Sequence, residues 1–132
     1  MGSGPLKIPD NRNKVLLVDD NQLVLQTLGM LCEVLGVESV CSAGGALALQ
    51  QLESDHFSLV ITDVRMPQMS GIQLMHRIKE SQPHLPVVLV SAFELSHYEK
   101  IIADHFANGV LAKPLTLQTL QSLFDDFGVH GR

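Results

Sequence analysis

Residues 59–71 read LVITDVRMPQMSG, an apolar run that ends on a single carboxylate, Asp63, and then breaks into a loop. A short aliphatic and β-branched run without alternation is typical of a strand that is buried on both faces. Pro67 and Gly71 then predict a turn and the beginning of a helix. Asp63 therefore stands at the carboxyl end of a predicted buried strand.

Four similar apolar runs predict four more strands, each followed by an amphipathic segment. The predicted strands cover residues 14–18, 37–42, 58–62, 86–90 and 109–112, and the predicted helices cover about 21–36, 45–52, 71–81, 96–106 and 117–127. This alternation predicts a three-layer α/β fold, (βα)5, with a doubly wound parallel five-stranded sheet and helices on both faces. We expect one domain over residues 14–128, after a flexible lead-in at 1–13 that is partly a cloning remnant, and before a tail at 129–132.

The composition excludes several functional classes. The 132 residues carry a net charge of −5, which gives no basic footprint for nucleic acid or anionic lipid. The apolar runs fall well short of the ~20 residues of a membrane span. Cys32 and Cys41 lie within apolar patterns, which predicts buried thiols in a reducing compartment. We expect a cytoplasmic protein that binds neither DNA nor membranes.

Polar residues end four of the predicted strands. They are Asp19 and Asp20, Asp63, Ser91 and Lys113. The carboxyl ends of parallel strands open onto one edge of the sheet, so these side chains are expected to meet in one crevice. Each alone also suits a turn or a helix cap, but clustered carboxylates repel one another unless a cation neutralises them. Mg²⁺ prefers such oxygen ligands and is commonly shared with phosphate, and a carboxylate can act as the phosphoryl nucleophile.

The strand-end residues and their neighbours resemble those of the receiver domain of bacterial response regulators. The matching motifs are Asp19-Asp20, Asp63 within DVRMPQMSG, Ser91-Ala92 and Lys113-Pro114. The resemblance spans residues 14 to about 128. It implies the flavodoxin-like strand order 2-1-3-4-5 and a cis peptide bond between Lys113 and Pro114.

The resemblance also implies a role for each residue of the site. Asp63 would accept a phosphoryl group from a phosphohistidine on a histidine kinase or a histidine phosphotransfer protein. Mg²⁺ would be held by Asp20, by Asp63 and by the backbone carbonyl of Arg65, with Asp19 acting mainly through a bound water. The domain would catalyse only its own phosphorylation and slow dephosphorylation, so it would be a signalling domain and not an enzyme.

Two further residues would carry the signal. Lys113 would pair with the phosphoryl oxygens, and Ser91 would move to bind one of them. That movement would reshape the surface of helix four, strand five and helix five, which would act on an effector domain or a downstream partner protein.

Three features depart from the family pattern. Val110 occupies the position that usually carries an aromatic switch residue. The last helix, LTLQTLQSLFDDF, lacks the basic residues through which many members dimerise, so we expect a monomer or a weak dimer. Arg65 and Phe93 flank the expected path of the attacking water, which predicts a long-lived phosphoryl group.

Three other functions compete with this one. A haloacid-dehalogenase-type hydrolase needs a second aspartate two residues after the nucleophile, where this chain has Arg65. A flavodoxin-like protein would need a hydroxyl-rich phosphate loop, and the paired carboxylates Asp19 and Asp20 would repel the phosphate of FMN. A pseudo-receiver that binds partners without phosphate normally lacks one of the five site residues, and all five are present here.

Overall fold

The computed structural model describes residues 14–92 and 107–131. The described elements are β1 (Lys14–Val18), α1 (Gln22–Val34), β2 (Glu38–Ser42), α2 (Gly45–Ser54), β3 (Leu59–Asp63), α3 (Gly71–Ser81), β4 (Val87–Ala92), β5 (Gly109–Lys113) and α5 (Leu117–Asp126). The lead-in predicted at 1–13 and the helix predicted at 96–106 lie outside the described residues.

All five strands are parallel and lie in the order β2-β1-β3-β4-β5, which confirms the predicted fold and strand order. Strands β3, β4 and β5 each extend one or two residues further than the sequence pattern predicts. Asp63 and Lys113 are therefore the last residues of their strands, and Ser91 is the last but one. The hydrogen-bonded register pairs Asp63 with Val90, and Ser91 with Ala112, so these ends are held level at one edge of the sheet.

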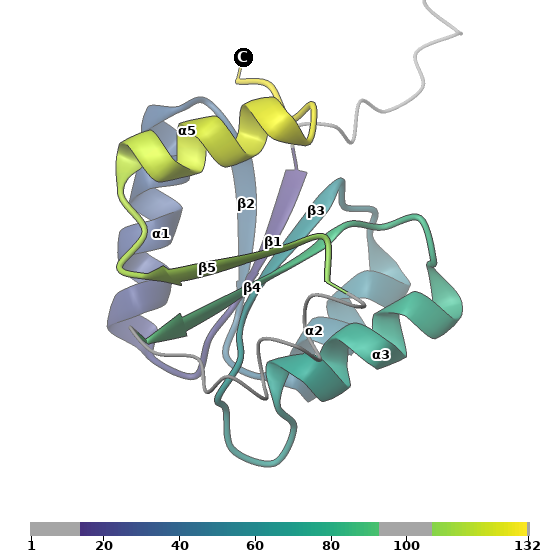
Figure 1. The fold of residues 1–132 in the computed structure, drawn as a ribbon. Coiled ribbons are helices and arrows are strands. Elements are labelled where there is room, and N and C mark those ends of the chain that lie inside the picture. Colours follow the sequence, from purple (N-terminus) through teal and green to yellow (C-terminus); the bar gives the residue numbers. More distant parts are fainter. Residues whose placement is uncertain (1–13, 93–106, 132) are drawn as a thin grey trace, which may run out of the picture.

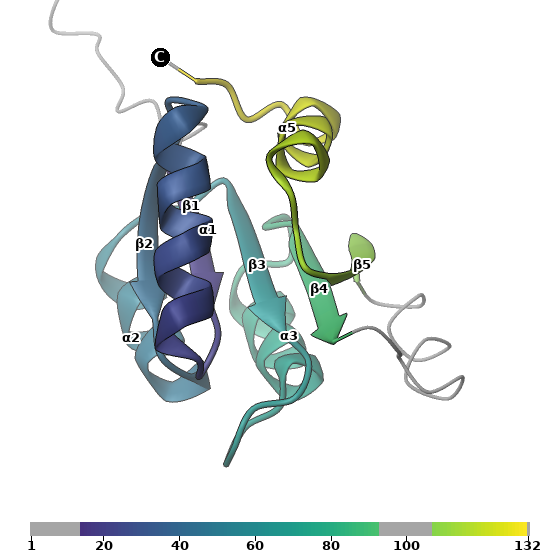
Figure 2. The same cartoon turned by 90° about the vertical axis from the view of Figure 1, so that its left-hand side faces the viewer.

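Helices cover both faces of the sheet, with α1 and α5 on one side and α2 and α3 on the other (Figures 1 and 2). Successive strand residues point to opposite faces. In β1, Leu17 accordingly packs in the core under α1 and α5, while Leu16 packs in the core under α2 and α3. Both side chains are fully buried, which explains why this strand reads as a continuous apolar run.

Side-chain caps begin three of the helices, α1, α3 and α5, at defined residues. Asn21 accepts hydrogen bonds from the backbone N–H groups of Leu23 and Val24, at 2.9 and 3.2 Å, and so begins α1. Ser70 and Gln73 form a reciprocal capping box at the beginning of α3. These caps begin α1 and α3 directly after the loops that follow β1 and β3.

Two sequence-based expectations about burial need correction. Cys32 is buried as predicted, but Cys41 is exposed, because β2 is an edge strand of the sheet. The sequence pattern also places Leu117 with Leu120 and Phe124 on one apolar face of the last helix. In the structure Leu117 is 38% exposed at the first turn of α5, and Leu123 is buried instead.

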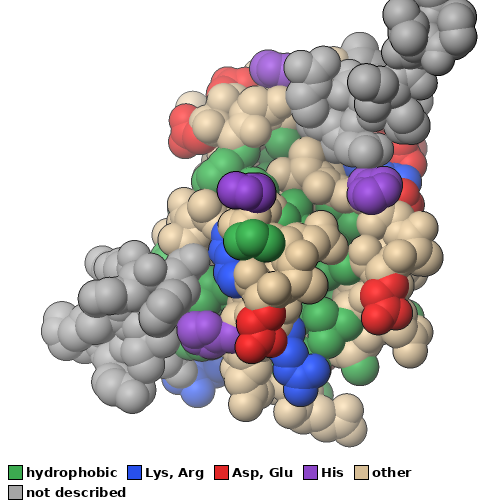
Figure 3. Space-filling model, turned by 90° about the vertical axis from the view of Figure 1, so that its right-hand side faces the viewer, with side chains coloured by type: hydrophobic (Ala, Val, Ile, Leu, Met, Phe, Trp, Pro, Cys, Tyr) green, Lys and Arg blue, Asp and Glu red, His purple; other side chains and the backbone are tan. Residues whose placement is uncertain are grey.

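The described surface carries charges of both signs. On the face drawn in Figure 3, Lys and Arg side chains are interspersed with Asp, Glu and His side chains. Among residues 14–92 and 107–131, none of the helices has the length and apolar character needed to cross a bilayer.

Candidate functional site

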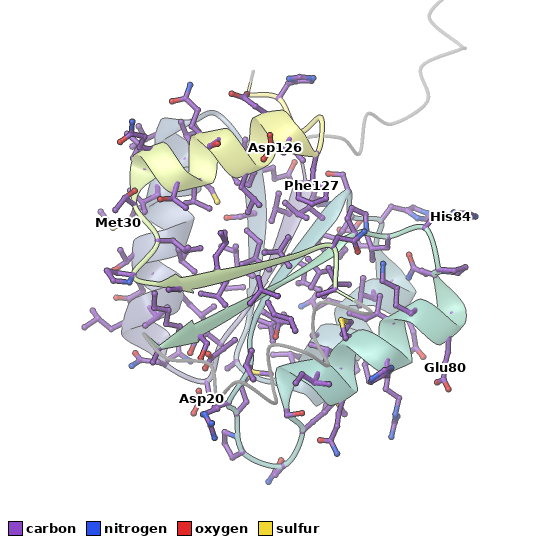
Figure 4. All side chains as sticks on the ribbon, in the orientation of Figure 1. Asp20, Met30, Glu80, His84, Asp126 and Phe127 are labelled. Carbon is purple, nitrogen blue, oxygen red and sulfur yellow. The ribbon has the colours of Figure 1, made fainter. Side chains whose placement is uncertain are left out.

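Three carboxylates gather at the carboxyl edge of the sheet. Asp19, Asp20 and Asp63 each place one carboxylate oxygen within 4.8 Å of the others. Asp19 and Asp63 are buried, with 2% and 8% of their surface exposed, whereas Asp20 is exposed. Asp20 lies at the lower edge of the molecule in Figure 4. The cluster is therefore closed on the protein side and accessible from solvent on the side of Asp20.

Lys113 supplies a cation to this cluster. Its Nζ lies 2.7 Å from Oδ2 of Asp19, to which it donates a hydrogen bond, and 3.4 Å from Oδ1 of Asp63. Burial acts to lower the pKa of Lys113, but the hydrogen bond to Asp19 and the charges of both carboxylates outweigh burial and raise this pKa. Lys113 is therefore fully charged at neutral pH.

The carboxyl group of Asp63 is held in an unfavourable environment for its charge. Burial raises its pKa most, the charges of Asp19 and Asp20 add to that rise, and Lys113 opposes it. One ammonium beside three carboxylates leaves two negative charges when all are ionised. A divalent cation would supply the missing positive charge, and carboxylate oxygens are the ligands that Mg²⁺ prefers. The residues present therefore fit such an ion.

Asn21 orients one of the buried carboxylates. Its backbone N–H donates a hydrogen bond of 2.9 Å to Oδ1 of Asp19, which leaves Oδ2 for Lys113. The sequence identifies Asn21 only as a helix cap. Its hydrogen bond to Asp19 comes from the backbone and depends on the conformation of residues 19–21. The type of side chain at position 21 therefore could not have predicted it.

The backbone carbonyl of Asp63 lies directly against Gly71. A Cβ atom added to Gly71 would stand 2.0 Å from this carbonyl oxygen, and the N–H of Gly71 donates to the carbonyl of Val64 at 2.8 Å. Gly71 is thus needed for a close approach of two backbone segments. The motif indicated a glycine at the beginning of the helix, but the contact with Asp63 appears only in the folded chain.

The structure places the other predicted site residues at the same edge. Ser91 is buried near the end of β4, and its hydroxyl donates to the carbonyl of Ala92 at 3.4 Å. Arg65 is exposed in the loop after β3. Phe93 lies outside the described residues. The Lys113-Pro114 peptide bond is cis, as predicted.

A cavity of about 250 Å³ adjoins the carboxylates. Apolar side chains of α1, β3, β4 and the β5–α5 turn form most of its lining, together with Asp63 and Lys113. Leu23, at the beginning of α1, is 70% exposed and also lines this cavity. An apolar surface therefore reaches from the outside of α1 to the buried carboxylates.

Comparison with known proteins agrees with this arrangement. The family model of the response regulator receiver domain matches residues 15–125. The chain belongs to this family. It is therefore a receiver domain of the kind found in two-component systems, a signalling domain, which sets aside the dehalogenase-type and FMN-binding alternatives.

Curated relatives include proteins of very different length. The chain is 31% identical over 122 residues to the autoinducer 1 sensor kinase/phosphatase LuxN of Vibrio campbellii, covering 92% of this chain and 14% of LuxN. It is 27% identical over 118 residues to the polar-differentiation response regulator DivK of Brucella ovis, covering 85% of this chain and 96% of DivK. The chain thus spans a small part of one relative and nearly all of another.

Solved structures show the same fold. A response regulator receiver protein from Pseudomonas putida superposes with a TM-score of 0.81 at 30% identity, covering 87% of this chain and 97% of that one. The chemotaxis protein CheY4 of Vibrio cholerae gives a TM-score of 0.80 at 27% identity, covering 86% and 97%.

Proposed function

We propose that this receiver domain accepts a phosphoryl group on Asp63 from a phosphohistidine of a histidine kinase or a histidine phosphotransfer protein, with Mg²⁺ as cofactor. The observation that supports this most is the environment of Asp63. Its carboxylate is 8% exposed, lies 3.4 Å from the Lys113 ammonium, and shares the sheet edge with Asp19 and Asp20. A carboxylate beside both a metal-ligand set and a fixed cation suits phosphoryl transfer.

In this proposal Asp20, Asp63 and the backbone carbonyl of Arg65 hold Mg²⁺, and Asp19 contributes through a water. When bound, Mg²⁺ supplies positive charge that offsets the carboxylates and the phosphoryl oxygens. Asn21 keeps Asp19 oriented through its backbone N–H. The exposed position of Asp20 leaves a side of the cluster accessible for the ion and its remaining waters.

The transfer exchanges one bond to phosphorus for another. An oxygen of Asp63 forms the new P–O bond while the P–N bond of the phosphohistidine breaks, and the imidazole leaves as the neutral base after taking up a proton. Lys113 pairs with the phosphoryl oxygens through its ammonium. The phosphoryl group is later removed by slow hydrolysis. Water attacks phosphorus, the P–O bond to Asp63 breaks, and the free carboxylate and inorganic phosphate are the products.

The output is a change of surface beside the site. Ser91 turns toward the phosphoryl group, and the surface of the helix predicted at 96–106, of β5 and of α5 changes with it, as a shift between two existing arrangements. Val110 is partly buried against the core under α2 and α3, so its small side chain replaces a bulky switch residue in that movement. The recipient is an effector domain or a separate protein, and we place the domain, at residues 14–128 with a lead-in and a short tail, in the cytoplasm.

Intact mass after incubation with Mg²⁺ and a small amido- or acyl-phosphate donor tests the proposal. We expect a gain of about 80 Da, one phosphoryl group, in the wild type and in Glu33→Gln, which alters an exposed carboxylate on α1. Asp63→Asn should show no gain. A gain that persists in Asp63→Asn would move the acceptor elsewhere. No gain and no Mg²⁺ binding in the wild type would make the chain a pseudo-receiver.

A further inference from the structure

Hydrogen bonds close the two ends of the loop between β3 and α3. We call this loop, residues 64–70, the acceptor loop, and it forms the lower tip of the molecule in Figure 1. The N–H of Val64 donates to the carbonyl of Val90 at 2.9 Å, and the N–H of Gly71 donates to the carbonyl of Val64 at 2.8 Å. The first residue of the loop is thus tied to β4, and the beginning of α3 is tied back to that residue.

The middle of the acceptor loop has a strained backbone. Gln68 has a φ of 70°, and it is the one non-glycine residue with a positive φ in the part of the chain that the structure describes. The N–H of Met69 donates to the carbonyl of Pro67 at 2.7 Å, which makes Gln68 the central residue of a γ-turn with positive φ, a rare and strained form. Such a conformation persists only where its surroundings enforce it.

Met69 supplies a contact that can enforce this turn, by packing its side chain on the beginning of α2. A Cβ atom added to Gly45, the buried first residue of α2, would stand 2.5 Å from the sulfur of Met69 and 3.1 Å from its Cβ. Because the Cβ of Met69 is also this close, turning its side chain would not fully relieve such a contact. Gly45 is therefore needed for space. We call this contact the Met69 seat.

Only part of the acceptor loop packs against the domain core. Met66 and Met69 lie against the core under α2 and α3. A hollow of about 460 Å³ borders the loop and is lined by residues 64–67, Ser70 and Ile72. The loop therefore spans a hollow, and the Met69 seat fixes its second half to α2.

We propose that Met69 is a positioning residue for the metal site and acts through the backbone carbonyl of Arg65. This inference rests on the proposed function, in which that carbonyl is a ligand of Mg²⁺. Mg²⁺ demands near-ideal octahedral geometry, so a carbonyl ligand must be held in place by its surroundings. With Met69 seated on Gly45, the loop is ordered before the ion binds, and binding then carries little of the entropy cost of ordering it.

Amide hydrogen exchange in the metal-free protein, followed by NMR at Gly71, tests whether the Met69 seat holds the loop. Met69→Ala removes the side chain and Gly45→Ala fills its place, so each should speed exchange at Gly71 by on the order of tenfold. Leu52→Ala is the matched control, because it removes a buried side chain of α2 from the same core, two helical turns from Gly45. It should leave that rate within about threefold of the wild type, and thermal unfolding shows that each variant is folded.

The dissociation constant of Mg²⁺, measured by isothermal titration calorimetry, tests the positioning role. Met69→Ala and Gly45→Ala should each raise this constant about five- to tenfold, whereas Leu52→Ala should change it by no more than about twofold. The double variant Gly45→Ala/Met69→Ala should bind Mg²⁺ like Met69→Ala, because both changes remove the same contact. Faster exchange at Gly71 with unchanged Mg²⁺ affinity, or an effect of Leu52→Ala as large as that of Met69→Ala, would overturn the positioning role.

A second double variant, Gln68→Gly/Met69→Ala, tests whether the seat enforces the strained turn. Glycine adopts a positive φ readily, so the loop should regain its shape without the seat and the dissociation constant of Mg²⁺ should return to within about threefold of the wild type. A constant no lower than that of Met69→Ala would overturn this account. A wild type that binds no Mg²⁺ would instead overturn the proposed function, and exchange at Gly71 would still show whether Met69 holds the loop.

Discussion

Lys113 donates a hydrogen bond of 2.7 Å to Asp19, a residue 94 positions away in the sequence. Asp19 follows β1 and Lys113 ends β5, so the contact links two strands that are not neighbours in the sheet. The contact to Asp63 is longer, at 3.4 Å. The Lys113 ammonium therefore binds mainly to Asp19, and it lies next to Asp63, the proposed phosphoryl acceptor, while bound there.

Replacing Lys113 by Met should destabilise the metal-free domain by about 2 kcal/mol, because the buried carboxylate of Asp19 loses its partner. Urea unfolding at pH 7 measures the change. Arg77→Met removes an exposed cation from α3 and should leave the free energy of unfolding within ~0.5 kcal/mol of the wild type. Adding Asp19→Asn to Lys113→Met should recover part of the loss, and a loss unchanged by Asp19→Asn would contradict this account.

Asp63→Asn should make the metal-free domain more stable than the wild type at pH 7. The folded pKa of Asp63 is raised above its ordinary value of 3.8, so folding favours its protonated form. The stability that Asp63 contributes is present below pH 3.8 and is lost as the pH rises through the folded pKa. The advantage of Asp63→Asn should therefore grow from about pH 4 to pH 7 in urea unfolding with a chelator present. An advantage that is constant with pH would show that ionisation of Asp63 is not its source.

Mg²⁺ should stabilise the domain through the three carboxylates. For a dissociation constant near 1 mM, 10 mM Mg²⁺ raises the free energy of unfolding by about 1.4 kcal/mol. Asp20→Asn should lose most of this increment, while Glu33→Gln should retain it, and a chelator should reverse it in both the wild type and Glu33→Gln. An equal Mg²⁺ effect in Asp20→Asn would place the ion outside the cluster.

Gly71→Ala should destabilise the domain by about 2 kcal/mol or more, because its Cβ would stand 2.0 Å from the carbonyl oxygen of Asp63. We expect slower phosphorylation as well, since the acceptor loop must shift. Gly29→Ala is the control: a Cβ in α1 would lie 3.8 Å from the sulfur of Cys41, an ordinary contact, so this variant should be neutral or more stable by up to ~1 kcal/mol. Similar unfolding free energies for the two variants would contradict the close approach at Gly71.

Phe93→Ala should shorten the lifetime of the phosphoryl group, because the ring is expected to restrict the path of the attacking water. Decay of the phosphorylated protein, followed by intact mass after the donor is removed, measures the effect. Equal decay in the wild type and the variant would remove this role for Phe93.

Much of the fold could be predicted because it depends on local patterns. The apolar run locates the strand containing Asp63 but predicts its end one residue early, because an aspartate is typical of turns. In the sheet Asp63 is still part of β3 and pairs with Val90 of β4. Cys41 was misplaced for another reason. It follows Val40 in a predicted strand, but β2 is an edge strand, and the position of a strand in the sheet is a property of the whole topology.

By itself, the sequence determined the alternation of strands and helices and the polar residues near the ends of four strands, because side-chain periodicity and chain direction depend on neighbouring residues. The tertiary structure alone decided that Lys113 binds Asp19 more closely than Asp63, that Gly71 lies against the carbonyl of Asp63, and that three apolar side chains of α1 stay exposed. These features depend on distances between segments far apart in the chain, which are set when the two cores pack and bury one side of each helix.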